Sequence, residues 1–394
     1  MNTPDHVLVV GASAGGLATV EALRRKGYAG QVTVLGAESH LPYDRPPLSK
    51  QILSGSWEPE RARLRPPSAL SALDAEFVLG DPATGLEVSA RAVRTASGRV
   101  LSADAVVVAT GLRPRTLPGQ TGLAGVHMLR TLDDALALRM DLLSGTRLVV
   151  VGDGVLGAEI AATARGMGVP VALAGPQPAP LALQLGQPAA GLLAELHAEH
   201  GVELRLGAAV SGLTERHGRV TGVRLETGEV LPADVVVVAF GAAPATEWLA
   251  GSGLELADGL VCDSRCRAAE AIYAVGDMAR WHHETLDRSL RLENRTNATE
   301  QAITVAGNIL GEDRPYTPIP YFWTDQFDAK IHVHGMPSPD AEVSIVEGAV
   351  AERRFVAVYR RDGQAVGVLG WNMPKQARQH RAELATTPLL AGSA

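Results

Sequence analysis

Features that mark secreted, membrane and nucleic-acid-binding proteins are scarce in this 394-residue sequence. Its two cysteines, Cys262 and Cys266, are too few for a disulfide framework and suit a reducing compartment. No apolar run reaches the roughly 18 residues of a transmembrane helix, and the polar N-terminus does not resemble a signal peptide. The net charge of −7 argues against non-specific binding to a phosphate backbone. We therefore expect a cytoplasmic protein that binds neither membranes nor nucleic acid.

Aromatic residues are also few, at 4% of the chain, so Val, Leu and Ala must fill most of the core. A large share of these aromatics lies from Tyr316 onward, where the sequence changes in character. This change indicates a separate α+β domain in the last part of the chain. The length of 394 residues is too great for one ordinary core and predicts two or three domains.

Two segments have the order strand, glycine-rich turn, helix and strand that is typical of dinucleotide-binding units. In the first, strands at 6–10 and 31–35 flank a turn and a helix. The turn residues expected to contact a cofactor are Gly11, Ser13, Ala14, Gly15 and Gly16. The serine replaces the middle glycine of the G-x-G-x-x-G pattern but is small enough for close approach. Glu38 follows the second strand, where a carboxylate accepts ribose hydroxyls, although a solvated loop acid is the alternative.

The second unit has strands at 146–151 and 169–174. Between the first strand and the helix lies the turn Gly152-Asp153-Gly154-Val155-Leu156-Gly157, which matches G-x-G-x-x-G in the context that supports it. The first glycine makes the tight turn, the second lets the backbone approach a pyrophosphate, and the helix N-terminus faces the phosphate charge. Two such units imply two dinucleotide-binding modules in one chain.

Further strands end in glycine turns, near which we expect the chain to cross between domains. Ligands bind at the carboxyl ends of strands in open α/β sheets, so cofactor contacts are expected there. The residues concerned are Ala109, Thr110, Gly111, Gly241, Gly276 and Asp277. A plain tight turn is the competing interpretation of Ala109-Thr110-Gly111, and helix capping is the competing interpretation of Asp277.

No metal site is predicted. Cys262 and Cys266 form neither a C-x2-C dithiol nor half of a zinc site, so we interpret them as structural thiols. Neither His282-His283 nor His332-x-His334 has a Cys or acidic cluster that would complete a set of ligands. We expect these histidines to be exposed, on a loop and on one face of a strand.

Two longer motifs are more specific. They are Pro42-Tyr43-Asp44-Arg45-Pro46-Pro47-Leu48-Ser49-Lys50 and Pro320-Tyr321-Phe322-Trp323-Thr324-Asp325-Gln326. Together with Ala109-Thr110-Gly111, residues 273–277 and Asn297-Ala298-x-Glu300-Gln301, they resemble the oxygenase-coupled NAD(P)H:ferredoxin reductases. The resemblance implies an α/β fold with two Rossmann-like domains. It places an FAD-binding domain at 1–112 and 242–315, an inserted NAD(P)H-binding domain at 113–241, and a C-terminal α+β interface domain at 316–394.

The resemblance also implies the reaction. FAD would take hydride from a nicotinamide coenzyme and pass electrons singly to a [2Fe-2S] ferredoxin that serves a cytochrome P450 or a Rieske oxygenase. Lys50 and Glu159 would be the catalytic ion pair beside the flavin, with Trp323 near the flavin edge. A lysine ammonium stabilises negative charge on reduced flavin. The glutamate offsets the positive charge of the lysine and orients the nicotinamide. Carried over by position, the FAD contacts are Arg45, Ala83, Ala109, Arg130 and Asp277.

Departures from the family pattern bear on coenzyme and flavin. Gly175 stands at the strand end where an acid usually selects NADH, and no Arg or Lys between 166 and 203 can accept a 2′-phosphate. We expect NADH, with NADPH also allowed. Arg295 replaces a Trp or aliphatic residue near the flavin and either raises its potential or points to solvent. Ala37 replaces an acid found in some relatives, so Glu38 is expected to act alone.

The acceptor is suggested by charge. Residues 350–385 carry seven basic and three acidic side chains on an otherwise acidic protein, which could steer an acidic ferredoxin. A solvated charged face is an equal alternative. No cysteine occurs between 42 and 51, so a dithiol relay is absent and single-electron transfer from flavin is the natural route. Other acceptors (rubredoxin, quinone, oxygen) and a slow redox-sensing flavoprotein are the competing functions. We expect a monomer or weak homodimer.

Overall fold

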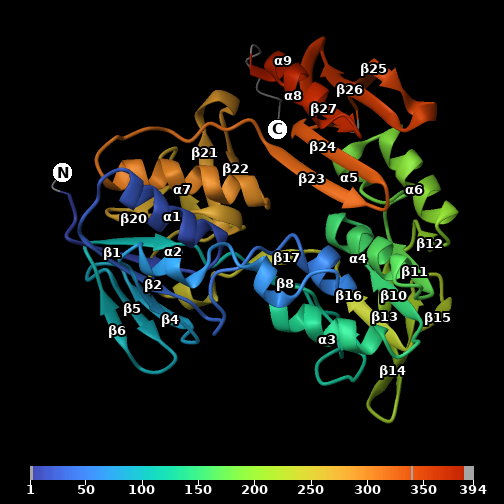
Figure 1. The fold of residues 1–394 in the computed structure, drawn as a ribbon, viewed down its shortest axis with the longest axis horizontal. Coiled ribbons are helices and arrows are strands. Elements are labelled where there is room, and N and C mark those ends of the chain that lie inside the picture. Colours follow the sequence, from blue (N-terminus) through green and yellow to red (C-terminus); the bar gives the residue numbers. More distant parts are fainter. Residues whose placement is uncertain (1–2, 339, 386–394) are drawn as a thin grey trace.

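A computed structural model describes residues 3–338 and 340–385. The strands that precede the two glycine turns belong to separate sheets (Figure 1). The sheet nearer the N-terminus has six strands, and only its edge strand β19 runs antiparallel to its neighbour. Across the sheet the order is β19 (Arg267–Ala269), β20 (Ile272–Ala274), β7 (Ala105–Val108), β1 (His6–Val10), β2 (Gln31–Leu35) and β3 (Glu76–Val78).

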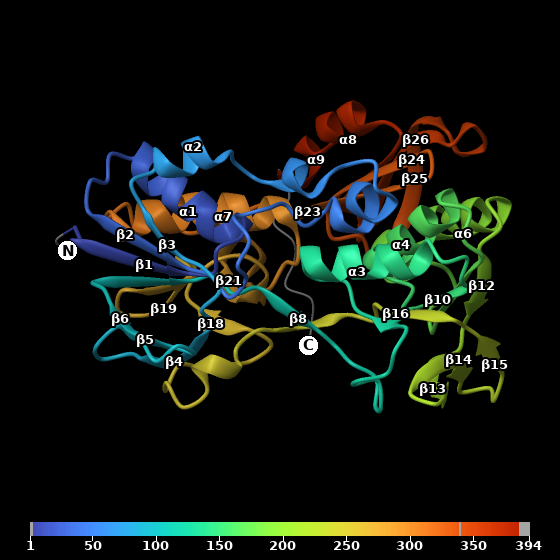
Figure 2. The same cartoon turned by 60° about the horizontal axis from the view of Figure 1, so that its bottom comes forward.

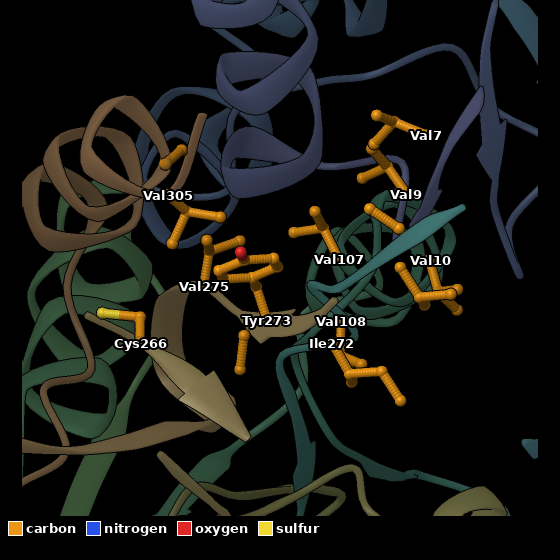
Figure 3. Packing of buried hydrophobic residues seen from close by; sticks show 14 of the residues in the cluster. Val7, Val9, Val10, Val107, Val108, Cys266, Ile272, Tyr273, Val275 and Val305 are labelled. Carbon is orange, nitrogen blue, oxygen red and sulfur yellow. The ribbon is translucent and has the colours of Figure 1, made fainter. Parts of the chain in front are cut away.

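This first sheet is covered on both faces, which explains why its central strands are apolar throughout. All four residues of β7 are buried. Helices α1 (Ala14–Arg25) and α7 (Arg295–Ile309) pack together on one face (Figure 1). Val305 of α7 lies near Tyr273 and Val275 in the core beneath it (Figure 3). Two three-stranded sheets also belong to this half. One consists of β4 (Ala83–Glu87), β5 (Ala92–Thr95) and β6 (Val100–Ser102), and the other of β18 (Leu260–Cys262), β21 (Ala279–His283) and β22 (Arg288–Leu290). The short helices are η2 (Pro59–Ala62), α2 (Pro67–Ser71), η3 (Glu247–Leu249) and η5 (Glu284–Leu286).

The second parallel sheet has five strands and carries the other glycine turn. Its order is β12 (Glu203–Leu206), β11 (Val171–Gly175), β10 (Leu148–Val151), β16 (Val235–Val238) and β9 (Val126–His127). Apolar residues of α3 (Leu132–Leu142) and α4 (Val155–Gly166) pack on one face. The other face packs on a small antiparallel sheet, β13 (Val210–Arg216), β14 (Arg219–Leu225) and β15 (Val230–Pro232). Two further helices follow β11, namely α5 (Ala182–Leu185) and α6 (Ala189–Glu199).

The chain passes between the halves through two adjacent segments. β8 (Leu112–Pro114) leaves the first half and β17 (Ala242–Pro244) returns to it, and the two pair as an antiparallel ribbon (Figure 2). We retain 1–112 with 242–315, 113–241 and 316–394 as a proposed division into domains.

The last part of the chain forms a five-stranded antiparallel sheet. Its order is β23 (Tyr321–Gln326), β24 (Ala329–Gly335), β27 (Gln364–Trp371), β26 (Arg354–Arg361) and β25 (Glu342–Ala349). One face packs against α5 and α6 of the second half through residues such as Leu193 and Phe355. The short helix α8 (Pro374–His380) covers the other face, with η6 (Val350–Glu352) and α9 (Ala382–Ala385) beside the sheet. Residues 386–394 of the predicted interface domain lie outside the described residues.

The predicted fold class, two Rossmann-like domains and a C-terminal α+β domain, is confirmed. The predicted strand at 146–151 begins only at Leu148. The expectation that the paired histidines are exposed is wrong for two of them. His283 lies in β21 and His334 in β24, and both are buried because neighbouring elements cover those faces. Within residues 3–338 and 340–385, no helix combines the length and apolar character that a membrane crossing requires.

Candidate functional site

The first glycine loop connects β1 to α1 and requires glycine at two points. Gly11 has a φ of +125°, and a Cβ there would lie 2.2 Å from the carbonyl oxygen of Ala109. A Cβ on Gly16 would lie 1.8 Å from the carbonyl oxygen of Gly11. Ser13 stands at the N-cap of α1 but makes no capping hydrogen bond. The first-turn amides and the Ser13 hydroxyl therefore remain available for a ligand, which suits a pyrophosphate at a helix N-terminus.

A pocket opens beside this loop and gathers predicted cofactor residues from separate segments. Ser13, Glu38, Arg45, Ala83, Ala109 and Thr110 line it together. Its remaining lining residues are Val10, Gly11, Ala12, Leu35, Gly36, Ala37, His40, Tyr43, Pro82, Ala245 and Trp248. Many of the lining residues are small, which allows close approach of a nucleotide. Tyr43 and Trp248 were not predicted as site residues, although Tyr43 lies within the motif at 42–50.

Two neighbouring side chains hold Glu38 in place beside the pocket. Glu38 accepts a hydrogen bond from the Tyr43 hydroxyl, and Arg45 Nη2 donates to its Oε1 at 2.7 Å. Burial, the largest influence, raises the pKa of Tyr43 to about 12 and keeps the phenol protonated as a donor. The Tyr43 oxygen in turn accepts from the Leu132 amide at 3.0 Å, at the start of α3 in the other half. A carboxylate has about four acceptor sites, so Glu38 retains capacity for ribose hydroxyls.

Behind the pocket, two guanidinium groups lie near one carboxylate. Arg45 donates to the carbonyl oxygen of Arg130, and Arg130 Nη2 lies 3.8 Å from Asp277 Oδ2. Burial, followed by repulsion from Arg45, lowers the pKa of Arg130 to about 10. Burial raises the pKa of Asp277. Two cations that repel each other in a partly buried place fit an anionic ligand such as the FAD pyrophosphate. The residues present therefore fit FAD.

Three other predicted site residues of this half, Gly15, Gly276 and Arg295, make contacts within the protein. The Gly276 amide donates to Gln301 Oε1 at 2.8 Å and opens the short turn η4 (Gly276–Met278). Gly15 lies against Val275, since an added Cβ would be 3.2 Å from that side chain. Arg295 does not point to solvent: its Nε donates to Asp44 Oδ1 at 2.6 Å. It thereby ties the start of α7 to the motif at 42–50.

The predicted ion pair joins the two halves. Lys50 lies in the π-helical turn η1 (Leu48–Ile52) of the first half, and Glu159 lies in α4 of the second. Lys50 Nζ is 2.7 Å from Glu159 Oε2, and their side chains are only 14% and 7% exposed. Ser49 donates to the same oxygen at 2.6 Å, and Thr324 of β23 donates to Oε1 at 2.9 Å. Donors from the first half and from the C-terminal sheet thus surround one buried carboxylate of the second half, as a buried charge requires.

A chain of hydrogen bonds continues from Glu159 into the C-terminal sheet. Gln326 Nε2 donates to the Thr324 hydroxyl at 3.0 Å, and His197 Nε2 lies 2.7 Å from Gln326 Oε1. Because an amide oxygen only accepts, His197 carries its proton on Nε2. Burial lowers the pKa of His197, which favours this neutral form. Trp323 lies on the opposite face of β23 from Thr324 and stacks with Tyr321 at a centroid distance of 6.0 Å.

The second glycine loop repeats the geometry of the first in a more open setting. Gly152 has a φ of +119°, and a Cβ on Gly157 would lie 1.9 Å from the Gly152 carbonyl oxygen. Nothing lies within 4 Å of a Cβ on Gly154, which leaves room for a ligand. Val155 and Leu156 begin α4, and Leu156 is exposed. Gly241 and Gly111 both have positive φ and flank the ribbon of β8 and β17.

The cysteines lie apart from both loops, in the core of the first half. Cys262 and Cys266 are buried and unbridged, and burial raises the pKa of Cys266 to about 12. Such a thiol stays protonated at neutral pH and is a poor nucleophile. Among residues 3–338 and 340–385, no group of three or more His, Cys, Asp or Glu side chains is placed to hold a metal ion.

Comparison with known proteins agrees with this geometry. The family described as Pyridine nucleotide-disulphide oxidoreductase matches residues 5–302, and the domain described as Reductase C-terminal matches residues 321–388. The chain belongs to the pyridine nucleotide-disulphide oxidoreductase family. Members of this family bind FAD and NAD(P), so the expected cofactors are confirmed.

Relatives within the family extend the likeness over the whole chain. A benzene 1,2-dioxygenase system ferredoxin–NAD(+) reductase subunit of Pseudomonas putida is 38% identical over 375 residues, 94% of this chain and 90% of that one. The ferredoxin reductase for the CYP199A2 system from Rhodopseudomonas palustris has a TM-score of 0.93 at 32% identity, covering 99% and 97% of the two chains. A covalent putidaredoxin reductase–putidaredoxin complex gives 0.92 at 33% identity, covering 98% and 94%. The resemblance to ferredoxin reductases is therefore confirmed.

Proposed function

We propose that this oxidoreductase is an FAD-dependent NAD(P)H:ferredoxin reductase, whose [2Fe-2S] ferredoxin serves a cytochrome P450 or a Rieske oxygenase. The observation that carries the proposal is the buried Lys50–Glu159 pair, which joins a pocket suited to FAD with a loop suited to NAD(P)H. Bound FAD supplies a group that accepts hydride and releases electrons one at a time. The full-length similarity to ferredoxin reductases of P450 and dioxygenase systems supports the same acceptor here.

Each half then has its own task. In the first half, the loop at 11–16, Glu38 and the Arg45–Arg130–Asp277 cluster would hold FAD. In the second half, the loop at 152–157 would hold the coenzyme. Lys50 would stabilise negative charge on the flavin ring, and Glu159 would fix the Lys50 ammonium and orient the nicotinamide. The neutral, buried Cys262 and Cys266 would take no part, so electrons leave without a thiol relay.

The docking surface proposed for an acidic ferredoxin is narrower than the basic segment at 350–385. Arg353 pairs with Glu199 and Arg360 with Glu383, so these two cations are already neutralised. Arg378 and Arg381, on and after α8, lie near enough to His334 to lower its pKa, after the larger effect of burial. Lys375 is exposed on the same helix. We infer that the ferredoxin contacts α8 and the residues beside it. For the reductase itself, we expect a monomer or weak homodimer.

The test is anaerobic stopped-flow reduction of the flavin by NADH and by NADPH, followed by reoxidation with a [2Fe-2S] ferredoxin at rising salt. Fast reduction, with ferredoxin turnover that falls as salt rises while dye reduction barely changes, is the expected result. Slow reduction by both coenzymes would contradict a reductase and favour a redox-sensing flavoprotein. Equal salt sensitivity of ferredoxin and dye would remove the electrostatic docking surface alone.

A further inference from the structure

The two glycine loops can be aligned with each other by hydrogen bonds alone. In the first, the Gly11 amide donates to the carbonyl of Leu35 at 2.7 Å. In the second, the Gly152 amide donates to the carbonyl of Ala174 at 2.8 Å. Leu35 and Ala174 are therefore equivalent, and so are the residues that follow each of them. The equivalent pairs are Ala12 and Asp153, Gly36 and Gly175, and Glu38 and Gln177.

The alignment shows that the acidic residue stands on a different loop in each half. In the first half the carboxylate is Glu38, on the loop after the second strand, and Ala12 on the glycine loop is neutral. In the second half the equivalent of Glu38 is the neutral Gln177, and the glycine loop carries Asp153. The acid that is absent from the end of β11 thus has a counterpart on the neighbouring loop.

The structure brings that counterpart to the vacant place. A Cβ on Gly175 would lie 2.3 Å from Asp153 Cγ, so the carboxylate fills the space that a side chain at 175 would need. In the first half the same space beside Gly36 holds no carboxylate: such a Cβ would lie 2.8 Å from the Ala12 methyl and 2.8 Å from Leu79 Cδ2. The absence of a side chain at position 175 is what allows Asp153 to lie there.

Gln177 holds the carboxylate in this place. Its backbone amide donates to Asp153 Oδ2 at 2.7 Å, and its Nε2 donates to Oδ1 at 2.8 Å. The Leu183 amide fixes Gln177 in turn by donating to its Oε1 at 2.8 Å. Asp153 is 4% exposed. A carboxylate has about four acceptor sites, so each oxygen retains one for a further donor.

We propose that Asp153 is the specificity-determining acid of the coenzyme site and that Gln177 positions it. The proposal rests on the proposed function, in which the loop at 152–157 binds NAD(P)H. A carboxylate at the end of the second strand of such a unit accepts a hydrogen bond from a free ribose 2′-hydroxyl and repels a 2′-phosphate. No Arg or Lys between 166 and 203 offsets that repulsion. The ligand selected is an adenine dinucleotide without a 2′-phosphate.

The test measures binding of 5′-ADP and 2′,5′-ADP to the FAD-loaded protein by calorimetry, alongside kcat/KM for NADH and NADPH. Wild type should prefer the ligands without 2′-phosphate by about 100-fold, and Asp153→Asn should reduce this preference about tenfold or more. Gln177→Ala should reduce it less, because the carboxylate remains and loses only the hydrogen bond from Nε2, while the backbone amide at 177 still donates to it. Glu195→Gln, which removes an exposed charge from α6 in the same half, is the matched control and should leave the preference unchanged.

A swap keeps the test decisive if Asp153→Asn alone folds poorly. The double variant Asp153→Gly/Gly175→Asp returns the acid to the end of β11 and should restore the preference. Gly175→Asp alone should impair binding, because its Cβ meets Asp153. Binding of 5′-ADP with undiminished discrimination in Asp153→Asn would overturn this assignment while leaving the reductase in place. Failure of the wild type to bind either 5′-ADP or NADH would overturn both.

Discussion

The two nucleotide loops have nearly the same backbone but different surroundings. Around the loop at 11–16, other segments add Glu38, Arg45, Arg130 and a walled pocket. Around the loop at 152–157, a Cβ on Gly154 would meet nothing within 4 Å, and no Arg or Lys occurs between 166 and 203. The local turn thus suits a pyrophosphate in both halves, whereas the added segments differ. We therefore expect the first half to retain its nucleotide and the second to exchange it.

The largest effect on nucleotide binding should come from adding a methyl group to a glycine in each loop. Gly16→Ala and Gly157→Ala place a Cβ 1.8 and 1.9 Å from a backbone oxygen, so the loops must move in both variants. We expect Gly16→Ala to be purified largely without flavin. Gly157→Ala should stay yellow but bind NADH roughly 100-fold more weakly. The flavin-to-protein absorbance ratio and the KM for NADH measure the two losses. Equal flavin loss in both variants would contradict the division between a retaining and an exchanging half.

The next effect concerns the ion pair between the halves. Lys50→Met removes the ammonium and leaves Glu159 buried without its counter-charge. Flavin reduction by NADH should slow by about 100-fold, with the flavin still bound. Stopped-flow absorbance gives the rate, and the flavin midpoint potential should fall as the positive charge is lost. Lys330→Met, at an exposed position of β24, is the control. A reduction rate in Lys50→Met that matches the control would exclude a catalytic role.

A smaller effect is expected from the positive charge that surrounds the nucleotide pocket of the first half. Arg130→Met removes one of the two cations behind the FAD pocket and should weaken FAD binding about tenfold. Arg113→Met provides the comparison, because Arg113 pairs with Glu247 at an exposed site and such pairs contribute little. Fluorescence titration of the flavin-free protein with FAD gives both affinities. The same small change in the two variants would show that retention does not depend on the buried cation.

The smallest effect is a pH dependence located in the second half. Burial depresses the pKa of His197 below its ordinary 6.5, so the unfolded chain binds a proton that the folded protein does not. Stability from this group is therefore complete above about pH 6.5 and is lost as the pH falls. Thermal unfolding of the FAD-loaded protein at pH 7 and pH 5 should show a smaller difference in His197→Gln, by on the order of 1 kcal/mol. His334, whose pKa burial lowers to about 4, should keep part of the dependence. An unaltered difference would exclude His197.

Sequence patterns found what lies within short segments and missed what meets only after folding. Both glycine loops were predictable because each glycine pattern, with its flanking strand and helix, lies within one short segment of the sequence. The Thr324–Glu159 hydrogen bond joins residues 165 positions apart, and no local pattern indicates it. The burial of His334 was missed for the same reason: alternation along β24 places His332 and His334 on one face, but not what covers that face. Gly175 was recognised as unusual, yet its explanation lay on another loop.

Glu159 also has a bearing on how the protein is assembled. Its carboxylate receives Lys50 and Ser49 from one half of the molecule and Thr324 from the C-terminal sheet, while the helix that carries it belongs to the other half. The complete set of partners exists only when all three parts are in place. If the proposed role of Lys50 and Glu159 is correct, fast flavin reduction requires all three parts of the chain to be assembled, so formation of this site would report completed folding.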